Sequence, residues 1–441
     1  MKKFTINGGR RLSGKTEVSG AKNVALKTLV AACLTNEEVI IENVPLISDF
    51  FVMCDIIKEL GGEAEILDHK VRIRMRDFAK TKIGLDRAAE IRTSTIFLAP
   101  LLSRKGEAII PNPGGCRLGA RPIDRIIDGL IQMGAKIKYL SEDGYFHAKA
   151  ETLSGIDYRF EKNTHMGTET LILAAVMAKG KTVLENAAEE PEIDELIGFL
   201  NSMGAKIRRS GKRIIEIEGV DKLHGTHWTI LPDRNEIVTI AIAAIITGGD
   251  VFIKEVKKEG LVEFLEKLDE AGAGYEIKDD GIRFFAKGPL KATSVTTSPY
   301  PGFMTDWQAP WAILMTQVEG ESIIHETVFE NKLEYIKDLQ KMGVNAKLFN
   351  PEVKDKDEIY NFNLKDDHPE YFHAVKITGP TPLHNAVLTM HNIRAGAAVV
   401  LAALLAKGES TILEIEHLDR GYEKLEERLN NLGASIKRAE E

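Results

Sequence analysis

A three-residue phrase recurs six times along this chain of 441 residues. Each copy has a large apolar residue or alanine, then glycine, then glycine, alanine or valine, and the copies begin at Leu60, Met133, Met203, Ala271, Met342 and Leu432. The intervals are roughly 70 residues, except the last, which is nearer 90. Glycine is the residue expected where a helix ends, so the period indicates one supersecondary unit repeated six times.

Six strand-like octets keep the same period, with β-branched residues alternating with polar ones. They begin at Glu37, Gly106, Gly180, Gly249, Gly320 and Gly408. Alanine-rich apolar helices precede them, for example at 25–34, 170–178 and 395–406, and their small residues on nearly every face predict burial. The spacing of Ile123, Ile126, Ile127, Leu130 and Ile131 predicts an amphipathic helix before the glycine phrase. Each unit is therefore predicted to run buried helix, strand, amphipathic helix, glycine turn, strand.

Six such units exceed what one compact core accommodates, so two groups of three are expected. The predicted fold class is α/β, with helices inside and sheets outside. The long last interval contains a polar, acidic stretch, 351–370, which is predicted to be an exposed inserted loop.

Composition excludes several classes of protein. The net charge of −8 and the absence of a basic stripe disfavour a nucleic-acid binder. No apolar run is long enough to span a bilayer, and the first residues show no secretion signal, so the cytoplasm is expected. Three widely spaced cysteines argue against a disulfide framework, and no ligand spacing for a metal is present, so no metal site is expected.

The loop at 113–124, PGGCRLGARPID, has the most reactive setting in the chain. Glycines allow the backbone to approach a ligand closely, and the guanidiniums of Arg117 and Arg121 favour the thiolate of Cys116. The alternative is a surface turn with an incidental thiol. Cys33 and Cys54 lie in apolar helical stretches and are expected to be buried.

Other candidates stand near predicted helix starts. Lys22 and Asn23 precede the first buried helix, where an anion could bind, although a solvated lysine near a cap is the plainer interpretation. Asp306 precedes another buried helix as an N-cap or as a carboxylate aimed at a hydroxyl. Three arginines form a site only if they converge: Arg92, Arg394 and Arg420.

Residues 9–16 match the phosphate-binding pattern GxxxxGK[ST]. In a P-loop the lysine opens a helix, whereas the residues after Thr16 are predicted to form strand and turn. Nucleotide hydrolysis is therefore disfavoured.

Taken together, several motifs resemble those of the UDP-N-acetylglucosamine enolpyruvyl transferases, in the EPSP synthase superfamily. They are SGAKN at 19–23, the 113–124 loop, PDR at 232–234, TD at 305–306, ETVFEN at 326–331 and DRGYE at 419–423. The resemblance implies two inside-out α/β barrels, with the active site in the cleft between domains. It implies a first lobe at 22–231, carrying Cys116, and a second lobe at 1–21 and 232–441.

The implied reaction moves the enolpyruvyl group of phosphoenolpyruvate to the 3-hydroxyl of UDP-N-acetylglucosamine and releases phosphate, the first committed step of peptidoglycan synthesis. The implied chemistry needs no metal or redox cofactor. By position, Cys116 is implied to protonate C3 or assist product release, and to be the target of the epoxide fosfomycin. Asp306 is implied to take the hydroxyl proton. The residues implied to contact phosphoenolpyruvate are Lys22, Arg121, Arg394 and Arg420. Those implied to contact the sugar nucleotide are Asn23, Arg92, Arg121, Pro122, Asp124, Asp306 and Val328.

The sequence departs from the family pattern at three places. The family usually has arginine at Lys332, a Ser-Val-Gly phrase at 165–167 and often histidine at Ile126. Lysine keeps the charge of arginine but loses its planar fork. These departures are expected to concern nucleotide binding more than chemistry.

Two rival functions remain open. The sister enzyme that uses shikimate 3-phosphate usually has GSKS around its N-terminal lysine and lacks the loop cysteine, and both features differ here. A catalytically silent paralogue that senses the sugar nucleotide would not require a base and an acid together. The sequence does not indicate the oligomeric state.

Overall fold

The computed structural model describes residues 2–112 and 123–440. Contacts between Cα atoms divide these residues into two compact units. Unit 1 comprises the described residues up to Ser19 and from Pro232 onward, and unit 2 comprises the described residues between Gly20 and Leu231. The chain therefore passes from unit 1 to unit 2 after Ser19 and returns after Leu231.

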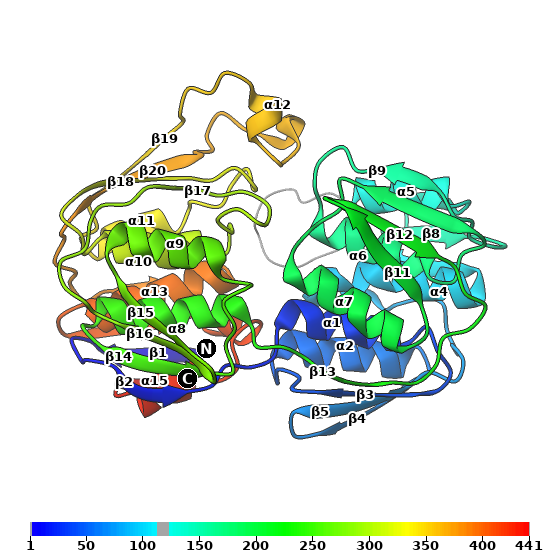
Figure 1. The fold of residues 1–441 in the computed structure, drawn as a ribbon, viewed down its shortest axis with the longest axis horizontal. Helices are drawn as coiled ribbons and strands as arrows, with labels where there is room; N and C mark the ends of the chain where they lie inside the picture. The colour runs from blue at the N-terminus through cyan, green and yellow to red at the C-terminus, as the bar shows by residue number, and fades with distance from the viewer. Residues whose placement is uncertain (1, 113–122, 441) are drawn as a thin grey trace. The chain divides into compact units, whose positions relative to one another are not determined.

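In the described part of unit 2, the strands form three sheets around its helices (Figure 1). The first has the order β13 (His227–Thr229), β3 (Glu38–Glu42), β5 (Lys70–Arg74), β4 (Glu63–Leu67). The second is β6 (Glu107–Pro111), β8 (Tyr145–Lys149), β7 (Lys136–Leu140). The third is β11 (Lys206–Gly211), β12 (Ile214–Glu218), β10 (Lys181–Glu185), β9 (Asp157–Arg159).

Unit 1 repeats this arrangement with three four-stranded sheets among its described residues. One is β15 (Gly274–Lys278), β16 (Gly281–Phe285), β14 (Asp250–Lys254), β2 (Ser13–Thr16). The next is β17 (Val295–Thr296), β18 (Gly320–His325), β20 (Ala374–Gly379), β19 (Ala346–Phe349). The last is β21 (Val387–Thr389), β22 (Glu409–Leu413), β1 (Lys2–Asn7), β23 (Ile436–Glu440).

The helices are interspersed among the strands along the chain. Those of unit 2 are α1 (Lys22–Ala32), α2 (Ser48–Glu59), α3 (Leu85–Glu90), the 3₁₀ helix η1 (Arg92–Phe97), α4 (Leu98–Lys105), α5 (Asp124–Gln132), α6 (His165–Ala175) and α7 (Pro191–Ser202). Those of unit 1 are α8 (Arg234–Ile246), α9 (Val262–Ala271), α10 (Gln308–Met315), α11 (Ile336–Lys341), α12 (Lys356–Ile359), η2 (Leu364–Asp366), α13 (Ile393–Leu405), α14 (Glu416–Asp419) and α15 (Leu425–Asn431).

The repeated unit has more strands than the sequence pattern predicted. After each amphipathic helix the sequence indicated one strand, but in unit 2 the pairs β4–β5, β7–β8 and β11–β12 are antiparallel hairpins. An edge strand is added in parallel, as β13 is to β3. In the three-stranded sheet this edge is reduced to a bridge between Lys82 and Ile109. Short polar edges give little periodic signal, which is why the pattern did not reveal them.

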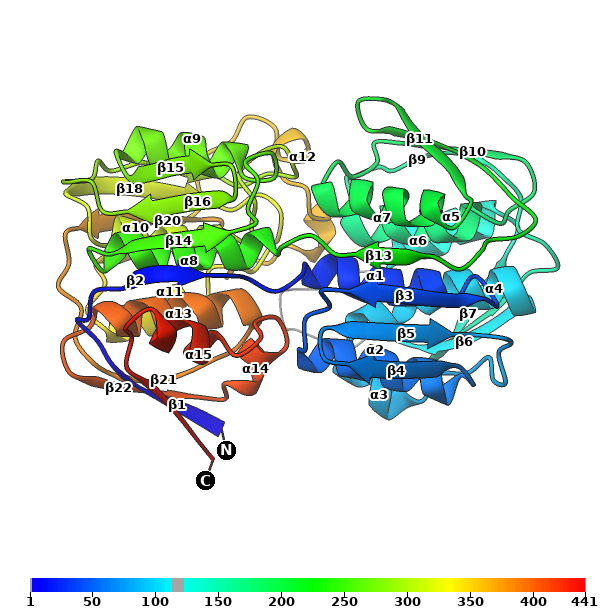
Figure 2. The same ribbon diagram turned by 60° about the horizontal axis from the view of Figure 1, so that its bottom comes forward.

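The alanine-rich helices are buried as expected, and the sheets lie outside them in each unit (Figure 2). Every residue of α8 except the last is buried, and so is every residue of α10. The described hydrophobic residues form two clusters, one within 21–230 and one within unit 1, so each unit has its own core. The predicted α/β class and the six-unit organisation are confirmed. Among the described residues, no helix has the length and apolarity to cross a membrane.

The stretch 351–370 is only partly the exposed loop that the sequence predicted. It contains α12 and η2, and it lies beyond β19 and β20 at the top of unit 1 in Figure 1. Two of its aromatic side chains are buried, Tyr360 at 2% exposure and Phe362 at 6%, and their ring centroids lie 4.9 Å apart. The Tyr360 ring also lies 4.9 Å from that of His373, so aromatic contacts anchor the insertion.

The last four residues of the GxxxxGK[ST] segment, 13–16, form strand β2, as the sequence context indicated. The Nζ of Lys15 lies 5.6 Å from the centroid of the Phe252 ring. No helix begins at Lys15, so the geometry of a P-loop is absent from this segment.

Candidate active site

The N-terminal end of α13 carries Arg394. The side chain of Asn392 caps the helix by accepting a hydrogen bond from the N–H of Ala395 at 2.9 Å. The rest of the helix consists mainly of buried alanine, valine and leucine residues. The helix therefore holds Arg394 in place, with only 9% of its side chain exposed. Its Nη1 is buried and has no hydrogen-bond partner among the described residues. Such a donor is available to an anionic ligand.

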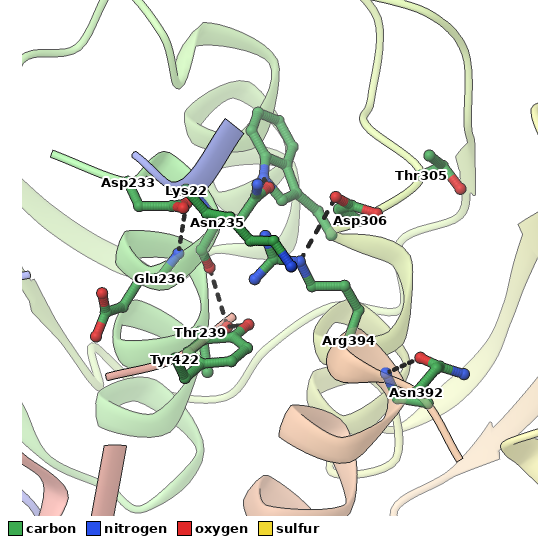
Figure 3. Close-up of polar contacts among 12 residues, drawn as sticks. Lys22, Asp233, Asn235, Glu236, Thr239, Thr305, Asp306, Asn392, Arg394 and Tyr422 are labelled. Carbon is green, nitrogen blue, oxygen red and sulfur yellow. Dashed lines mark hydrogen bonds and ion pairs between the residues drawn. The ribbon is translucent and has the colours of Figure 1, made fainter. Parts of the chain in front are cut away.

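Asp306 faces Arg394 from the start of α10, with 3.5 Å between Arg394 Nε and Asp306 Oδ2 (Figure 3). The N-cap position of α10 is occupied by Trp307, so the N-cap alternative for Asp306 is wrong. The second carboxylate oxygen, Oδ1, accepts a hydrogen bond from the Nζ of Lys332 at 2.9 Å. Asp306 is therefore paired with two cations.

Lys332 belongs to a chain of hydrogen bonds that sequence reasoning missed. Its Nζ also donates to the Oγ1 of Thr305 at 2.8 Å, and the Thr305 hydroxyl donates to Oε2 of Glu326 at 2.7 Å. The other oxygen of Glu326 accepts from the backbone N–H groups of Val328 and Phe329 at 2.8 and 3.0 Å. Burial raises the pKa of Glu326, and Lys332 opposes this rise. The predicted site residue Val328 thus contacts the network through its backbone.

The guanidinium of Arg394 also lies over the ring of Tyr422, 5.1 Å from its centroid. Burial disfavours the charge on Arg394, but its attraction to Tyr422 and Asp306 outweighs burial and raises the pKa of the guanidinium. The hydroxyl of Tyr422 lies 2.7 Å from Oγ1 of Thr239 on α8. Gly421 permits this packing, because a Cβ there would lie 2.5 Å from Cγ2 of Ile393.

The start of α8 contributes further polar groups. The Asp233 side chain caps the helix by accepting from the N–H groups of Asn235 and Glu236. Oδ1 of Asn235 accepts from the indole N–H of Trp307 at 3.0 Å. The first turns of α8, α10 and α13 therefore meet through their polar side chains in unit 1 (Figure 3).

Unit 2 holds a second set of predicted residues. Lys22 is the first residue of α1, and its Nζ lies 2.6 Å from Oδ2 of Asp49 on α2. The two side chains are 10% and 6% exposed, so this is a buried ion pair and not a solvated surface lysine. Asn23 is the next residue of the same helix and is partly buried.

The other predicted residues are more dispersed. Arg92 begins η1 and is partly buried, Asp124 begins α5 and is exposed, and Arg420 follows α14 in unit 1 and is partly buried. Cys116, Arg121 and Pro122 lie outside the described residues.

The departures from the family pattern lie in different environments. Ile126 is 2% exposed and belongs to the core of unit 2. His165, at the start of α6, lies 3.3 Å from Oε1 of the buried Glu169, whose other oxygen lies 3.4 Å from Nζ of Lys27. Burial disfavours the charge on His165, but the carboxylates of Glu169 and Glu190 raise the pKa of the imidazole above its ordinary value. Lys332, whose departure is expected to concern nucleotide binding more than chemistry, forms an ion pair with Asp306 at 2.9 Å.

A family model described as EPSP synthase (3-phosphoshikimate 1-carboxyvinyltransferase) matches residues 6–429. The chain belongs to the EPSP synthase family. The resemblance drawn from the motifs is thereby confirmed. A UDP-N-acetylglucosamine 1-carboxyvinyltransferase of Koribacter versatilis is 41% identical over 442 residues, covering 99% of this chain and 96% of the relative. UDP-N-acetylglucosamine 1-carboxyvinyltransferase 3 of Caldanaerobacter subterraneus subsp. tengcongensis is 41% identical over 441 residues, covering all of both chains.

A solved structure has a fold similar to that of this chain. The crystal structure of the enolpyruvyl transferase NikO from Streptomyces tendae matches with a TM-score of 0.86. The identity is 24%, and the match covers 99% of each chain, so this likeness supports the fold.

For this EPSP synthase family member, the motifs TD, ETVFEN and DRGYE identified the segments that meet in unit 1, but not the pairs that they form. Lys332 follows ETVFEN directly, and its charge next to that motif was the available signal. The roles of Asn235 and Thr239 had no signal beyond their place in a buried helix.

Proposed function

We propose that this chain is an enzyme that transfers the enolpyruvyl group of phosphoenolpyruvate to the 3-hydroxyl of UDP-N-acetylglucosamine, with release of phosphate. This is the first committed step of peptidoglycan synthesis, and the proposal places the enzyme in the cytoplasm with small-molecule substrates alone. The observation that carries the proposal is the Asp306 carboxylate held beside Arg394, whose buried Nη1 has no hydrogen-bond partner among the described residues. The names of the relatives at 41% identity over the whole chain support the choice of acceptor.

The proposed chemistry is addition followed by elimination. The oxygen of the 3-hydroxyl bonds to C2 of phosphoenolpyruvate, the hydroxyl proton passes to Asp306, and C3 gains a proton, which Cys116 is proposed to supply. In the second step C3 returns a proton to the Cys116 thiolate, the bond between C2 and the phosphate oxygen breaks, and inorganic phosphate leaves with the proton that Asp306 had taken. A carboxylate within reach of the hydroxyl typically contributes about 10²–10⁴-fold to such a rate.

The cations serve the anionic substrate and the charge that develops at C2. Lys22, Arg121, Arg394 and Arg420 are proposed to hold the phosphate and carboxylate of phosphoenolpyruvate. Fixed charges in a buried site stabilise a transition state more than mobile water does, because they need no reorganisation. Asn23, Arg92, Arg121, Pro122, Asp124, Asp306 and Val328 are proposed to contact the sugar nucleotide.

A two-substrate assay tests this proposal directly. The purified chain is mixed with phosphoenolpyruvate and either UDP-N-acetylglucosamine or shikimate 3-phosphate, and phosphate release is followed. We expect phosphate release when UDP-N-acetylglucosamine is the acceptor and none when shikimate 3-phosphate is the acceptor. Turnover with shikimate 3-phosphate alone would establish the sister activity, and no turnover with either would indicate a silent paralogue.

Fosfomycin tests the role of the loop cysteine. We expect the epoxide to alkylate Cys116 in the presence of the sugar nucleotide, which adds the mass of one fosfomycin molecule to the intact protein. A Cys116→Ser variant should gain no mass, whereas variants of the buried Cys33 and Cys54 should still be alkylated. An unmodified wild-type protein would count against the assignment of Cys116.

A further inference from the structure

The ammonium of Lys332 donates hydrogen bonds to side chains of the protein itself. Its side chain is 5% exposed. In the sequence, Lys332 lies between β18 and α11. Two hydrogens point at Oγ1 of Thr305 and Oδ1 of Asp306, at 2.8 and 2.9 Å, and the ring centroid of Phe329 lies 4.7 Å from Nζ. An ammonium has three donors, so two of them are used by protein oxygens, and the aromatic ring lies within cation–π distance of the charge. Lys332 therefore differs from Arg394, which has a buried donor without a partner among the described residues.

Thr305 and Glu326 also hold the Nζ of Lys332 in place. Glu326 is 1% exposed and is itself held by the N–H groups of Val328 and Phe329. The Thr305 hydroxyl donates its hydrogen to Glu326, so its lone pairs face Lys332. Each hydrogen bond in this series has a defined direction, and Lys332 links the series to Asp306. The buried carboxylate of Glu326 also gives the ammonium a nearby counter-charge.

We propose that Lys332 is a positioning residue that holds the Asp306 carboxylate in the orientation in which it takes the proton of the substrate hydroxyl. The inference rests on the proposed role of Asp306 as the proton acceptor. Hydrogen bonding of Oδ1 to a fixed ammonium restricts rotation of the carboxylate, and the second oxygen stays beside Arg394. A misplacement of about 1 Å in such a group costs about 10²-fold in rate.

The test compares Lys332→Met with Lys332→Arg. Methionine keeps the length and apolar stem of lysine but removes the charge and the donors. We expect kcat to fall about 10²-fold in Lys332→Met, while the Kd for the sugar nucleotide and the KM for phosphoenolpyruvate stay within about threefold. Arginine restores the charge and donors, so Lys332→Arg should recover kcat to within about tenfold of wild type.

Two results would overturn the inference. One is a kcat and a KM for phosphoenolpyruvate that are both unchanged in Lys332→Met, which would leave Lys332 without a role in turnover. The other is an unchanged kcat with a raised KM for phosphoenolpyruvate, which would make Lys332 a substrate-binding residue. Wild-type protein is measured in the same assay. If the wild type releases no phosphate, the proposed function is contradicted, whereas an active wild type with an equally active Lys332→Met variant contradicts only the role of Lys332.

Matched variants control for charge and for folding. Lys15→Met removes another lysine that lies against an aromatic ring, on the exposed strand β2, and should leave kcat unchanged. If Lys332→Met does not fold because Glu326 has lost its counter-charge, the double variant Lys332→Met/Glu326→Gln removes both charges. We expect the double variant to fold and to show the same loss of kcat, and a wild-type kcat in it would overturn the inference.

Discussion

Asp306 is the residue on which the proposed reaction depends most. Its two oxygens are paired with cations from separate segments, Lys332 on one side and Arg394 on the other. Cations beside a carboxylate favour its charged form, which is the form that accepts a proton. The same cations also orient the carboxylate. Asp306→Asn removes the charge of the carboxylate, whereas Lys332→Met removes a contact that orients it, so the two effects are separable.

The variant Asp306→Asn removes the charge but keeps the shape of the side chain. We expect kcat to fall about 10²–10⁴-fold, while the Kd for the sugar nucleotide changes by less than about tenfold. Phosphate release and titration calorimetry measure the two quantities. Asp250→Asn is a matched control, because Asp250 is paired with Arg283 in a sheet, at 2.6 Å, and should not affect turnover. Activity retained in Asp306→Asn would place the proton acceptor elsewhere.

A second carboxylate has consequences for stability. Burial raises the pKa of Glu195 from 4.5 to about 7, although the N–H of Leu231 and the indole of Trp228 donate to it. A raised pKa in the folded state means that Glu195 contributes its full stability below about pH 4.5 and loses it as the pH rises through about 7.

Glu195→Gln removes this titration while a glutamine oxygen can still accept from Leu231. We expect the variant to be more stable than wild type at pH 8, by on the order of 1–3 kcal/mol, and to lose less stability between pH 4.5 and 8. Chemical denaturation across pH measures the difference. Glu37→Gln is the contrasting control, because hydrogen bonds from Lys222 and Gly225 lower the pKa of Glu37 to about 2. An identical pH profile for Glu195→Gln and wild type would contradict the prediction.

At the scale of the element, the buried helices do two jobs. Their small apolar residues fill the core of each unit, and their first turns carry the polar residues of the candidate site. Helix α13 shows both, since Ala395 to Leu404 are buried and Arg394 lies in its first turn. A change at the helix cap is therefore expected to affect stability and site together.

Asn392→Ala removes the side-chain cap of α13. We expect the free energy of unfolding to fall by about 1 kcal/mol, and kcat to fall as well, because Arg394 lies in the uncapped turn. Asn392→Ser should restore both, since serine is also a good cap. Asp355 caps the four-residue helix α12 in the insertion, and Asp355→Ala should leave kcat unchanged. Denaturant unfolding and phosphate release are the measurements, and a normal kcat in Asn392→Ala would separate the cap from the site.

The sequence predicted the elements that have a strong periodic signal and missed strands that are too short or too polar to give one. Alanine-rich helices and the glycine after each amphipathic helix have strong periodic signals, so their order was predictable. The edge strands, such as β17 with two residues, are too short for such a signal. Within the site, TD and ETVFEN identified the segments, but the bond between Lys332 and Asp306 joins residues whose approach depends on tertiary packing. No local pattern encodes that distance.

At the scale of the whole molecule, the described residues form two units with separate hydrophobic cores. The residues proposed to act in the reaction are divided between them, with Lys22 in unit 2 and Asp306 and Arg394 in unit 1. The lobes proposed from the sequence, 22–231 and 1–21 with 232–441, imply that each lobe has a stability of its own. Single substitutions in one core can test this.

Phe199 and Phe264 form a matched pair for that test. Both are fully buried, Phe199 in the core of unit 2 against Trp228 and Phe264 in the core of unit 1 against Trp307 and Trp311. Replacing either with leucine should cost about 1–3 kcal/mol. If the cores unfold separately, calorimetry should show two transitions, with Phe199→Leu lowering one and Phe264→Leu the other. Because Trp307 also bonds to Asn235 beside the candidate site, Phe264→Leu should lower kcat more than Phe199→Leu does. An equal shift of one single transition by both variants would mean that the two cores unfold as one cooperative structure.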